Sequence, residues 1–143
     1  MKSLLLTLIT FLPFSTITAG EKVTVTVEVS NIPTAQGNLL IGIYDSAGTF
    51  VKTPLPQSPK IPLKSTEPIR ARIKGVKPGT YAIVIIHDVN GNGKLDKNFI
   101  GMPKEPIAFS QNPKIPMGLP SFDACSFVVD GEDLSLSIPL KLK

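Results

Sequence analysis

The side chains best suited to chemistry in this sequence lie in one short polar segment, residues 87–96 (HDVNGNGKLD). Oxygen-bearing side chains occupy every second position near its start, a glycine that permits a sharp bend comes next, and a further aspartate follows. A hard cation such as Ca²⁺ takes about six to eight oxygen ligands, which a wrapping chain supplies from alternate side chains and a backbone carbonyl. The spacing therefore predicts a calcium site, with ligands from Asp88, Asn90, Asn92, the carbonyl of Lys94, and Asp96.

This segment differs from an EF-hand, although its first positions are alike. An EF-hand loop needs a bidentate glutamate at its twelfth position, which here is Phe99. The spacing resembles the Asp-x-Asn-x-Asn-Gly-x-x-Asp calcium loops found between strands of extracellular β-proteins. Because only two ligands carry charge, we expect weak affinity, on the order of 10⁻⁴–10⁻³ M. A second interpretation stays open, since Asn-Gly-Asn-Gly also suits a tight hairpin turn in which both residue types accept positive φ.

An enzymatic alternative uses the only histidine. His87 could join Asp88, Asp96 and Glu105 in a cluster that serves a metal-dependent hydrolase. No nucleophile motif such as Gly-x-Ser-x-Gly accompanies these residues, so a structural role for His87 is favoured. The only cysteine, Cys125, alternates with apolar residues and is expected to be a buried, unreactive side chain. The sequence therefore favours a binding module over an enzyme.

The elements that must position these residues are strands. Beyond residue 20, apolar and polar side chains alternate with a period of two, which indicates half-buried β-strands. Residues 83–86 (IVII) are apolar on both faces and predict a central strand, whereas Pro139 indicates an edge strand. The pattern predicts an all-β fold, an antiparallel β-sandwich of about seven strands. The predicted strands are residues 23–30, 39–45, 69–76, 80–88, 107–110, 122–129 and 134–142, with a short one at 99–100.

The proline-rich stretch at residues 52–68 interrupts this rhythm with five prolines. Proline removes ladder donors and favours polyproline II, so we interpret the stretch as a long crossover between the two sheets. A docking motif for a proline-binding module is the alternative interpretation.

Composition limits the possible classes of protein. The 143 residues suit one domain, and the net charge of +4 comes from scattered lysines rather than the dense basic run of a nucleic-acid binder. A single cysteine excludes an internal disulfide framework and a cysteine-rich zinc site.

The N-terminus has the three-part layout of a secretory signal peptide. Lys2 precedes an apolar run at residues 4–14, and small residues follow up to a predicted cleavage after Ala19. The run is too short to span a bilayer. We therefore predict a signal peptide at residues 1–19, a single domain at residues 20–143, a periplasmic or extracellular location, and no membrane span after cleavage.

Longer blocks of sequence resemble a bacterial family known as domain of unknown function 2141. They are residues 76–82 (VKPGTYA), 87–96, 98–106 (NFIGMPKEP), 108–112 (AFSQN) and 122–124 (FDA), and the resemblance extends over about residues 23–142. It implies a small secreted protein with a prealbumin-like β-sandwich and no established activity. Pro106 and Ala108 stand where that family commonly has glycine.

The combined expectation is an exported, non-enzymatic binding or structural module. Its partner would be a protein or a glycan, with calcium as a stabilising ion of the loop at residues 88–96, and its oligomeric state is left open.

Overall fold

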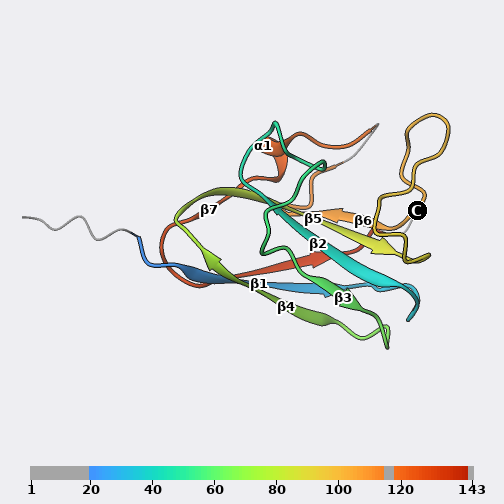
Figure 1. The fold of residues 1–143 in the computed structure, drawn as a ribbon, viewed down its shortest axis with the longest axis horizontal. Coiled ribbons are helices and arrows are strands. Elements are labelled where there is room, and N and C mark those ends of the chain that lie inside the picture. The colour runs from blue at the N-terminus through green and yellow to red at the C-terminus, as the bar shows by residue number, and fades with distance from the viewer. Residues whose placement is uncertain (1–19, 115–117, 142–143) are drawn as a thin grey trace, which may run out of the picture.

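The computed structural model describes residues 20–114 and 118–141, and the predicted signal peptide at residues 1–19 lies outside this part of the chain. Two β-sheets pack face to face, which confirms the predicted β-sandwich (Figure 1). In the described ranges there are eight strands and one short helix. None of the described helices is long and apolar enough to cross a membrane.

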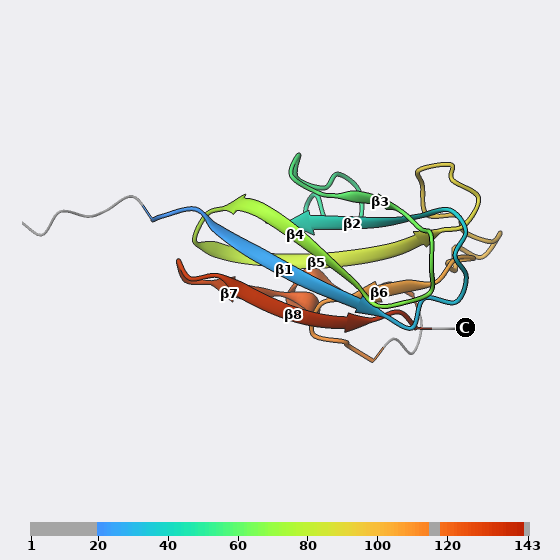
Figure 2. The same ribbon diagram turned by 90° about the horizontal axis from the view of Figure 1, so that it is seen from below.

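The smaller sheet has three strands in the order β4-β1-β8. Strand β1 (Val23–Ser30) lies in the middle and pairs antiparallel with β4 (Ile69–Val76). Strand β8 (Leu134–Pro139) pairs with β1 in parallel, an exception in a sandwich whose described strands otherwise pair antiparallel. Figure 2 shows these three strands lying across the layer that contains β2 and β5. Strand β8 is at the edge of its sheet, as Pro139 predicted.

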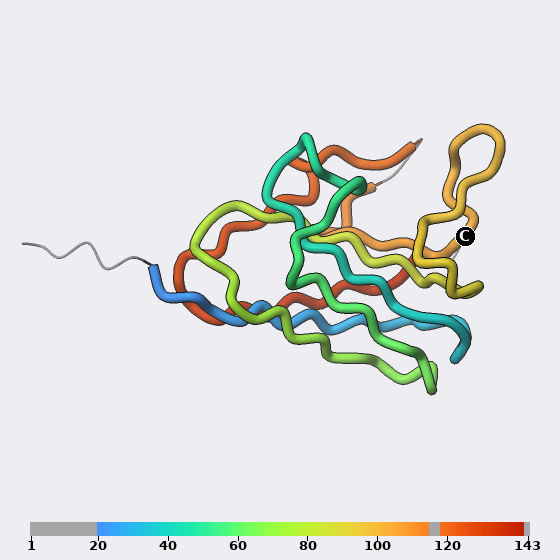
Figure 3. The backbone as a smooth tube through the Cα atoms, viewed as in Figure 1, coloured from blue at the N-terminus to red at the C-terminus, as the bar shows by residue number. Residues whose placement is uncertain are grey.

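The larger sheet has the order β3-β2-β5-β6. It consists of β3 (Lys60–Pro62), β2 (Asn38–Tyr44), β5 (Gly79–Asp88) and β6 (Ile107–Phe109), and β7 (Phe127–Val129) pairs with the first residues of β5. Strand β5 is central, as its doubly apolar sequence predicted. Figure 3 follows the chain from β2 through residues 45–59 and back to β3 beside β2.

The main core lies between the two sheets and is formed by the alternating apolar positions of the strands. In β1 every second residue is buried and its neighbours are half-buried, which is the pattern of a strand with one face against a core. The β-branched side chains fit this pleated surface well. The fully buried residues of the main core include Val25, Val27, Val29, Leu39, Ile73, Ile83 and Ile85.

A second apolar cluster covers part of the outer face of the five-stranded sheet. Tyr44, Val84 and Phe109 supply the sheet side, and the segment after β2 contributes Phe50, whose ring packs edge-on against Tyr44 with centroids 5.5 Å apart. The short helix α1 (Phe122–Cys125) closes the cluster. Strand β5 is thus apolar on both faces because both faces are covered.

Three local predictions are wrong. The proline-rich stretch contains a strand, β3, so the crossover between the sheets comes only after it. Residues 99–100 form an exposed turn, with Phe99 fully exposed, rather than a strand. The predicted strand at 122–129 begins as helix α1, because the Ser121 hydroxyl caps it by accepting from the backbone N–H of Ala124 at 3.2 Å.

A candidate binding groove beside a polar loop

The polar loop begins where β5 ends, at Asp88, whose side chain is fully buried. Its two carboxylate oxygens accept hydrogen bonds from the backbone N–H groups of Asn92 (3.0 Å) and Gly93 (2.8 Å). Gly91 and Gly93 both have φ near +75°, a conformation that glycine adopts without cost. Asp88 therefore closes the loop into a compact turn at the end of the sheet (Figure 1).

Asp96 gathers the two asparagine side chains of the loop. Its carboxylate accepts from Asn90 Nδ2 at 2.6 Å and from Asn92 Nδ2 at 2.9 and 3.1 Å. These hydrogen bonds, first from Asn92 and then from Asn90, lower the pKa of Asp96, and the nearby charges of Lys104 and Lys94 act in the same direction. Three oxygen-bearing side chains thus converge within hydrogen-bonding distance, and the carboxylate at their centre stays ionised at neutral pH.

Glu105 ties the two ends of the loop together. It is almost fully buried, at 6% exposed, and its Oε1 accepts from the N–H of Val89 at 3.1 Å while its Oε2 accepts from the N–H of Asp96 at 3.2 Å. The N–H of Lys104 also donates to the carbonyl of Asp96 at 2.7 Å. Because buried backbone N–H groups need partners, one carboxylate here fixes both flanks of the loop. The sequence had placed Glu105 only in a hydrolase cluster.

His87 lies apart from these carboxylates. Along β5 the odd-numbered side chains enter the main core and the even-numbered ones face outward, so His87 and Asp88 project from opposite faces of the sheet. His87 is fully buried, and its Nε2 is 2.8 Å from the carbonyl oxygen of Gln36. Within the described ranges, its Nδ1 has no hydrogen-bond partner. The structure therefore joins Asp88, Asp96 and Glu105 in one network and leaves His87 outside it.

The ligand set predicted for calcium contains two carboxylates, those of Asp88 and Asp96. Among the described residues no three His, Cys, Asp or Glu side chains gather as a metal-binding group. The side-chain oxygens of Asn90 and Asn92 accept from the N–H groups of Asn92 (3.1 Å) and Lys94 (2.9 Å). At present the side-chain NH₂ groups of Asn90 and Asn92 face the Asp96 carboxylate. To bind calcium beside Asp96, both side chains would have to turn their oxygens toward the ion, so the present hydrogen bonds compete with calcium.

Two other side chains that could act as nucleophiles, those of Cys125 and Ser110, have structural roles. Cys125 is fully buried, and burial raises the pKa of its thiol to about 11, so the thiolate is scarce at neutral pH. The hydroxyl of Ser110 accepts from the N–H of Ile83 at 2.9 Å and donates to the carbonyl of Cys125. The burial of Cys125 agrees with the prediction for that residue.

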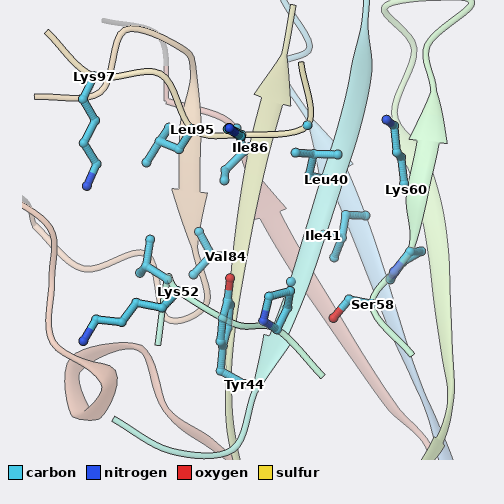
Figure 4. A pocket seen from close by; sticks show the side chains of 16 residues that line it. Leu40, Ile41, Tyr44, Lys52, Ser58, Lys60, Val84, Ile86, Leu95 and Lys97 are labelled. Atoms are coloured by element: carbon cyan, nitrogen blue, oxygen red, sulfur yellow. The ribbon is translucent and has the colours of Figure 1, made fainter. Parts of the chain in front are cut away.

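A groove lies on the outer face of the five-stranded sheet, between the polar loop and the segment that follows β2 (Figure 4). Its volume is about 420 Å³, within the range of small-molecule sites. The floor consists of outward-facing residues of β2 and β5, namely Leu40, Gly42, Tyr44, Val84 and Ile86. The walls come from residues 93–97 of the polar loop and from residues 51–60.

Gly42 makes room for the Tyr44 ring in the floor of the groove. Most positions of β2 carry large side chains, and a Cβ placed on Gly42 would lie 2.7–2.9 Å from the end of the Tyr44 ring. The ring therefore lies over the glycine, and its hydroxyl points along the floor toward Val84 (Figure 4). Burial raises the pKa of Tyr44, so its hydroxyl is neutral and available as a hydrogen-bond donor.

The rim of the groove is basic. Lys52, Lys60, Lys94 and Lys97 line it, all with exposed side chains, and none of the lining residues that the structure describes is acidic. Figure 4 shows Lys52 and Lys97 on one side and Lys60 on the other. In the part of the chain that the structure describes, the one ion pair joins Arg70 to Glu28, so none of the four lysines takes part in an ion pair.

The groove was missed in the sequence because its parts are far apart along the chain. One signal was present: a glycine inside an apolar strand, here Gly42 in LLIGIY, marks a close approach or a missing side chain. The lysines gave no signal, since they are separated by up to 45 residues and belong to three different segments. Of the predicted metal ligands, Lys94 is the one that also lines the groove.

Comparison with known proteins identifies the family. No curated protein and no solved structure matches the chain. Residues 27–137, well over half of the chain, match the model of a family described as uncharacterized proteins conserved in bacteria (DUF2141). The polar loop and all four rim lysines fall within the matched range. The chain therefore belongs to this bacterial family of uncharacterized proteins, as its sequence blocks predicted.

Proposed function

We propose that this protein is an exported, non-enzymatic binding module that takes its ligand in the groove on the outer face of the five-stranded sheet. One observation carries the proposal: an apolar floor of strand residues lies beneath a rim of four lysines, and the polar loop forms one wall. Concave sites with an apolar lining and a few polar groups are the common form of small-molecule sites. Strands β2 and β5 give this floor a rigid support.

The arrangement of the polar residues supports binding rather than catalysis. A hydrolase would need His87 and the three carboxylates to meet at one point. His87 instead contacts the carbonyl of Gln36 on the core side, and the oxygens of Glu105 accept from backbone N–H groups. The carboxylates thus hold the loop that shapes the groove.

A screen of small organic molecules by ¹H–¹⁵N NMR tests the proposal. We expect hits to shift the amide signals of the groove floor, above all those of Gly42 and Tyr44, without chemical change in the added molecule. Shifts scattered over the whole surface, or turnover of a screened compound, would contradict a binding module.

Export is the second part of the proposal. We expect the protein recovered from the periplasm or the medium of a bacterial host to begin at Gly20, because the apolar run and small residues before it match a signal peptide cut after Ala19. Intact-mass measurement gives the N-terminus directly. A cell-associated protein that retains Met1 or Lys2 would refute export by cleavage.

Calcium is the third part, as a weak stabiliser of the loop. The presence of Asp88, Asn90, Asn92 and Asp96 in one short loop supports it, since their side chains carry the hard oxygen donors that Ca²⁺ prefers. The ion would have to displace the amide hydrogen bonds that now join Asn90 and Asn92 to Asp96. Each oxygen of Asp88 accepts one backbone hydrogen bond and has a second lone pair available. The ion would rigidify the wall of the groove.

Addition of about 10 mM Ca²⁺ should raise the free energy of unfolding by about 1.4–2.7 kcal/mol, given dissociation constants of 10⁻³–10⁻⁴ M. Urea denaturation with calcium and with chelator measures the difference. The variant Asp96→Asn should lose the response, whereas Asp130→Asn, in an exposed turn remote from the loop in sequence, should keep it. Equal stability with and without the ion would leave the loop as a hydrogen-bonded turn alone.

A further inference from the structure

We infer that the groove binds small amphipathic organic anions: molecules with a carboxylate or similar acidic head and an apolar body. The inference rests on the proposed function and adds the chemical class of the ligand. It is carried by two features of the groove that occur together, an aliphatic floor and a basic rim whose lysines form no ion pair with any residue that the structure describes.

The floor selects an apolar body. Leu40, Val84 and Ile86 present aliphatic side chains, and the Tyr44 ring lies flat over the space left by Gly42. Residues 51–60 add the rings of Pro54 and Pro59 to one wall. A bare sugar would leave its hydroxyl groups against hydrocarbon without partners, which is unfavourable. A hydrocarbon or aromatic body gains from leaving water on the same surface.

The rim selects a negative head. Four of the chain's basic residues line this one groove, and none of them forms an ion pair within the described ranges. The Asp96 carboxylate on the loop accepts from Asn90 and Asn92 and forms no ion pair with a groove lysine among the described residues. Like charges gathered at a concave surface with an apolar floor attract an opposite charge to it.

The polar loop fixes one side of the rim. Lys94 and Lys97 flank Asp96, whose backbone is held by Glu105 and by the N–H of Lys104. Leu95, between them, also lines the groove and adds to its apolar surface (Figure 4). Hydrogen bonds to the carboxylate of Glu105 and to the backbone of Asp96 thus hold Lys94, Leu95 and Lys97 in fixed positions beside the floor.

The decisive experiment compares three amphiphiles with the same ten-carbon chain: decanoate, decyltrimethylammonium and the uncharged decyl maltoside, all below their micelle concentrations. ¹H–¹⁵N NMR titration of the exported protein follows each one. We expect decanoate to bind one to one, to shift the signals of Gly42, Tyr44 and Lys94, and to bind at least about tenfold more tightly than the cation. Binding of decanoate should weaken as salt increases, because the lysines are exposed and therefore screened.

Two pairs of variants separate charge from stability. Lys60→Glu with Lys97→Glu reverses two rim charges, and Lys22→Glu with Lys74→Glu makes the same change in net charge at and near the three-stranded sheet. Only the first pair should abolish the preference for decanoate over the cation. At half-buried Leu40, a glutamate should repel decanoate and a lysine should not, although both replace the same apolar side chain.

Each outcome bears on a separate claim. If the cation or the maltoside shifts the groove signals as strongly as decanoate, the groove binds ligands but the inferred charge class is wrong. If none of the three shifts these signals, the inference fails together with the proposed binding groove. If decanoate leaves the groove unshifted while vesicles of phosphatidylglycerol retain the protein, the lysines serve a membrane surface and the small-molecule inference is overturned.

Discussion

Replacement of Gly37 by alanine is expected to lower the free energy of unfolding by about 4 kcal/mol or more. Gly37 has φ of +74°, which alone costs an L-residue about 1–2 kcal/mol. Its new Cβ would also lie 2.0 Å from the carbonyl oxygen of Asp88 and 2.8 Å from the Cα of Val89. These are backbone atoms at the end of β5, so relief of the overlap requires the strand and the attached loop to move.

Gly91→Ala is the matched control for this effect. Gly91 has nearly the same φ, +73°, but the nearest atom to an added Cβ is Asn38 Nδ2 at 3.8 Å. It should therefore cost only the conformational penalty, about 1–2 kcal/mol. Urea denaturation followed by circular dichroism measures both variants. Equal losses would show that the contact between the β1–β2 turn and the end of β5 has no energetic importance.

Gly37→Ala also reports on the site. The turn that contains Gly37 carries the carbonyl of Gln36, the partner of His87, and the carbonyl of Gly37 accepts from the N–H of Leu63 at 3.0 Å. Displacement of this turn should therefore alter the NMR signals of Val89 and Asn92 as well as lower stability. Gly91→Ala should leave the signal of Leu63 in place.

Glu105→Ala is expected to be the second most damaging change in the site, with a loss of about 3 kcal/mol. The substitution removes one carboxylate and leaves two backbone N–H groups, those of Val89 and Asp96, without their acceptor. A buried donor left unsatisfied costs about 1–3 kcal/mol, and these two donors are partly buried. The segment between them, residues 90–95, should then become susceptible to proteases because both of its flanks are released.

Two further variants define the cause. Glu105→Gln keeps one acceptor oxygen and turns an amide NH₂ toward the other N–H, so its loss of stability should lie between those of wild type and Glu105→Ala. Glu132→Ala removes an exposed carboxylate and should change stability by less than about 0.5 kcal/mol. Denaturation and limited proteolysis give the two readouts. A Glu105→Ala protein with wild-type stability and protease resistance would refute the bridging role.

Together these variants test how the groove is supported. Gly37, in the β1–β2 turn, packs against the backbone at the end of β5. Glu105, which precedes β6, holds the loop by hydrogen bonds. Loss of either support should disorder Lys94 and Leu95, which form one wall of the groove. We therefore expect ligand affinity to fall in both variants in proportion to the motion of the loop.

The sandwich could be predicted because its strands obey a local rule. Val23 through Val29 alternate with polar residues, and a strand places alternate side chains on opposite faces. The apolar run at residues 83–86 likewise required cover on both faces, which the main core and the outer cluster provide.

The sequence pattern did not predict which strands pair with each other, or the short elements that depend on their neighbours. The three residues of β3 form a strand because Leu39 and Leu40 of β2 offer an open edge beside them, not because of their own propensity. Helix α1 forms under the influence of the Ser121 cap and the outer cluster, against the alternation of its neighbours. The parallel pairing of β8 with β1 depends on the route of the whole chain.

The sequence alone determined most of the strands, which loop carries hard oxygen donors, and the family to which the chain belongs. Only the tertiary structure decided that His87 faces away from Asp88, that Glu105 bridges the loop, and that four distant lysines surround Gly42 and Tyr44. The physical reason is range. Alternation and turn chemistry act between residues a few positions apart, whereas a groove is made by side chains that meet only after the sheets have paired and packed.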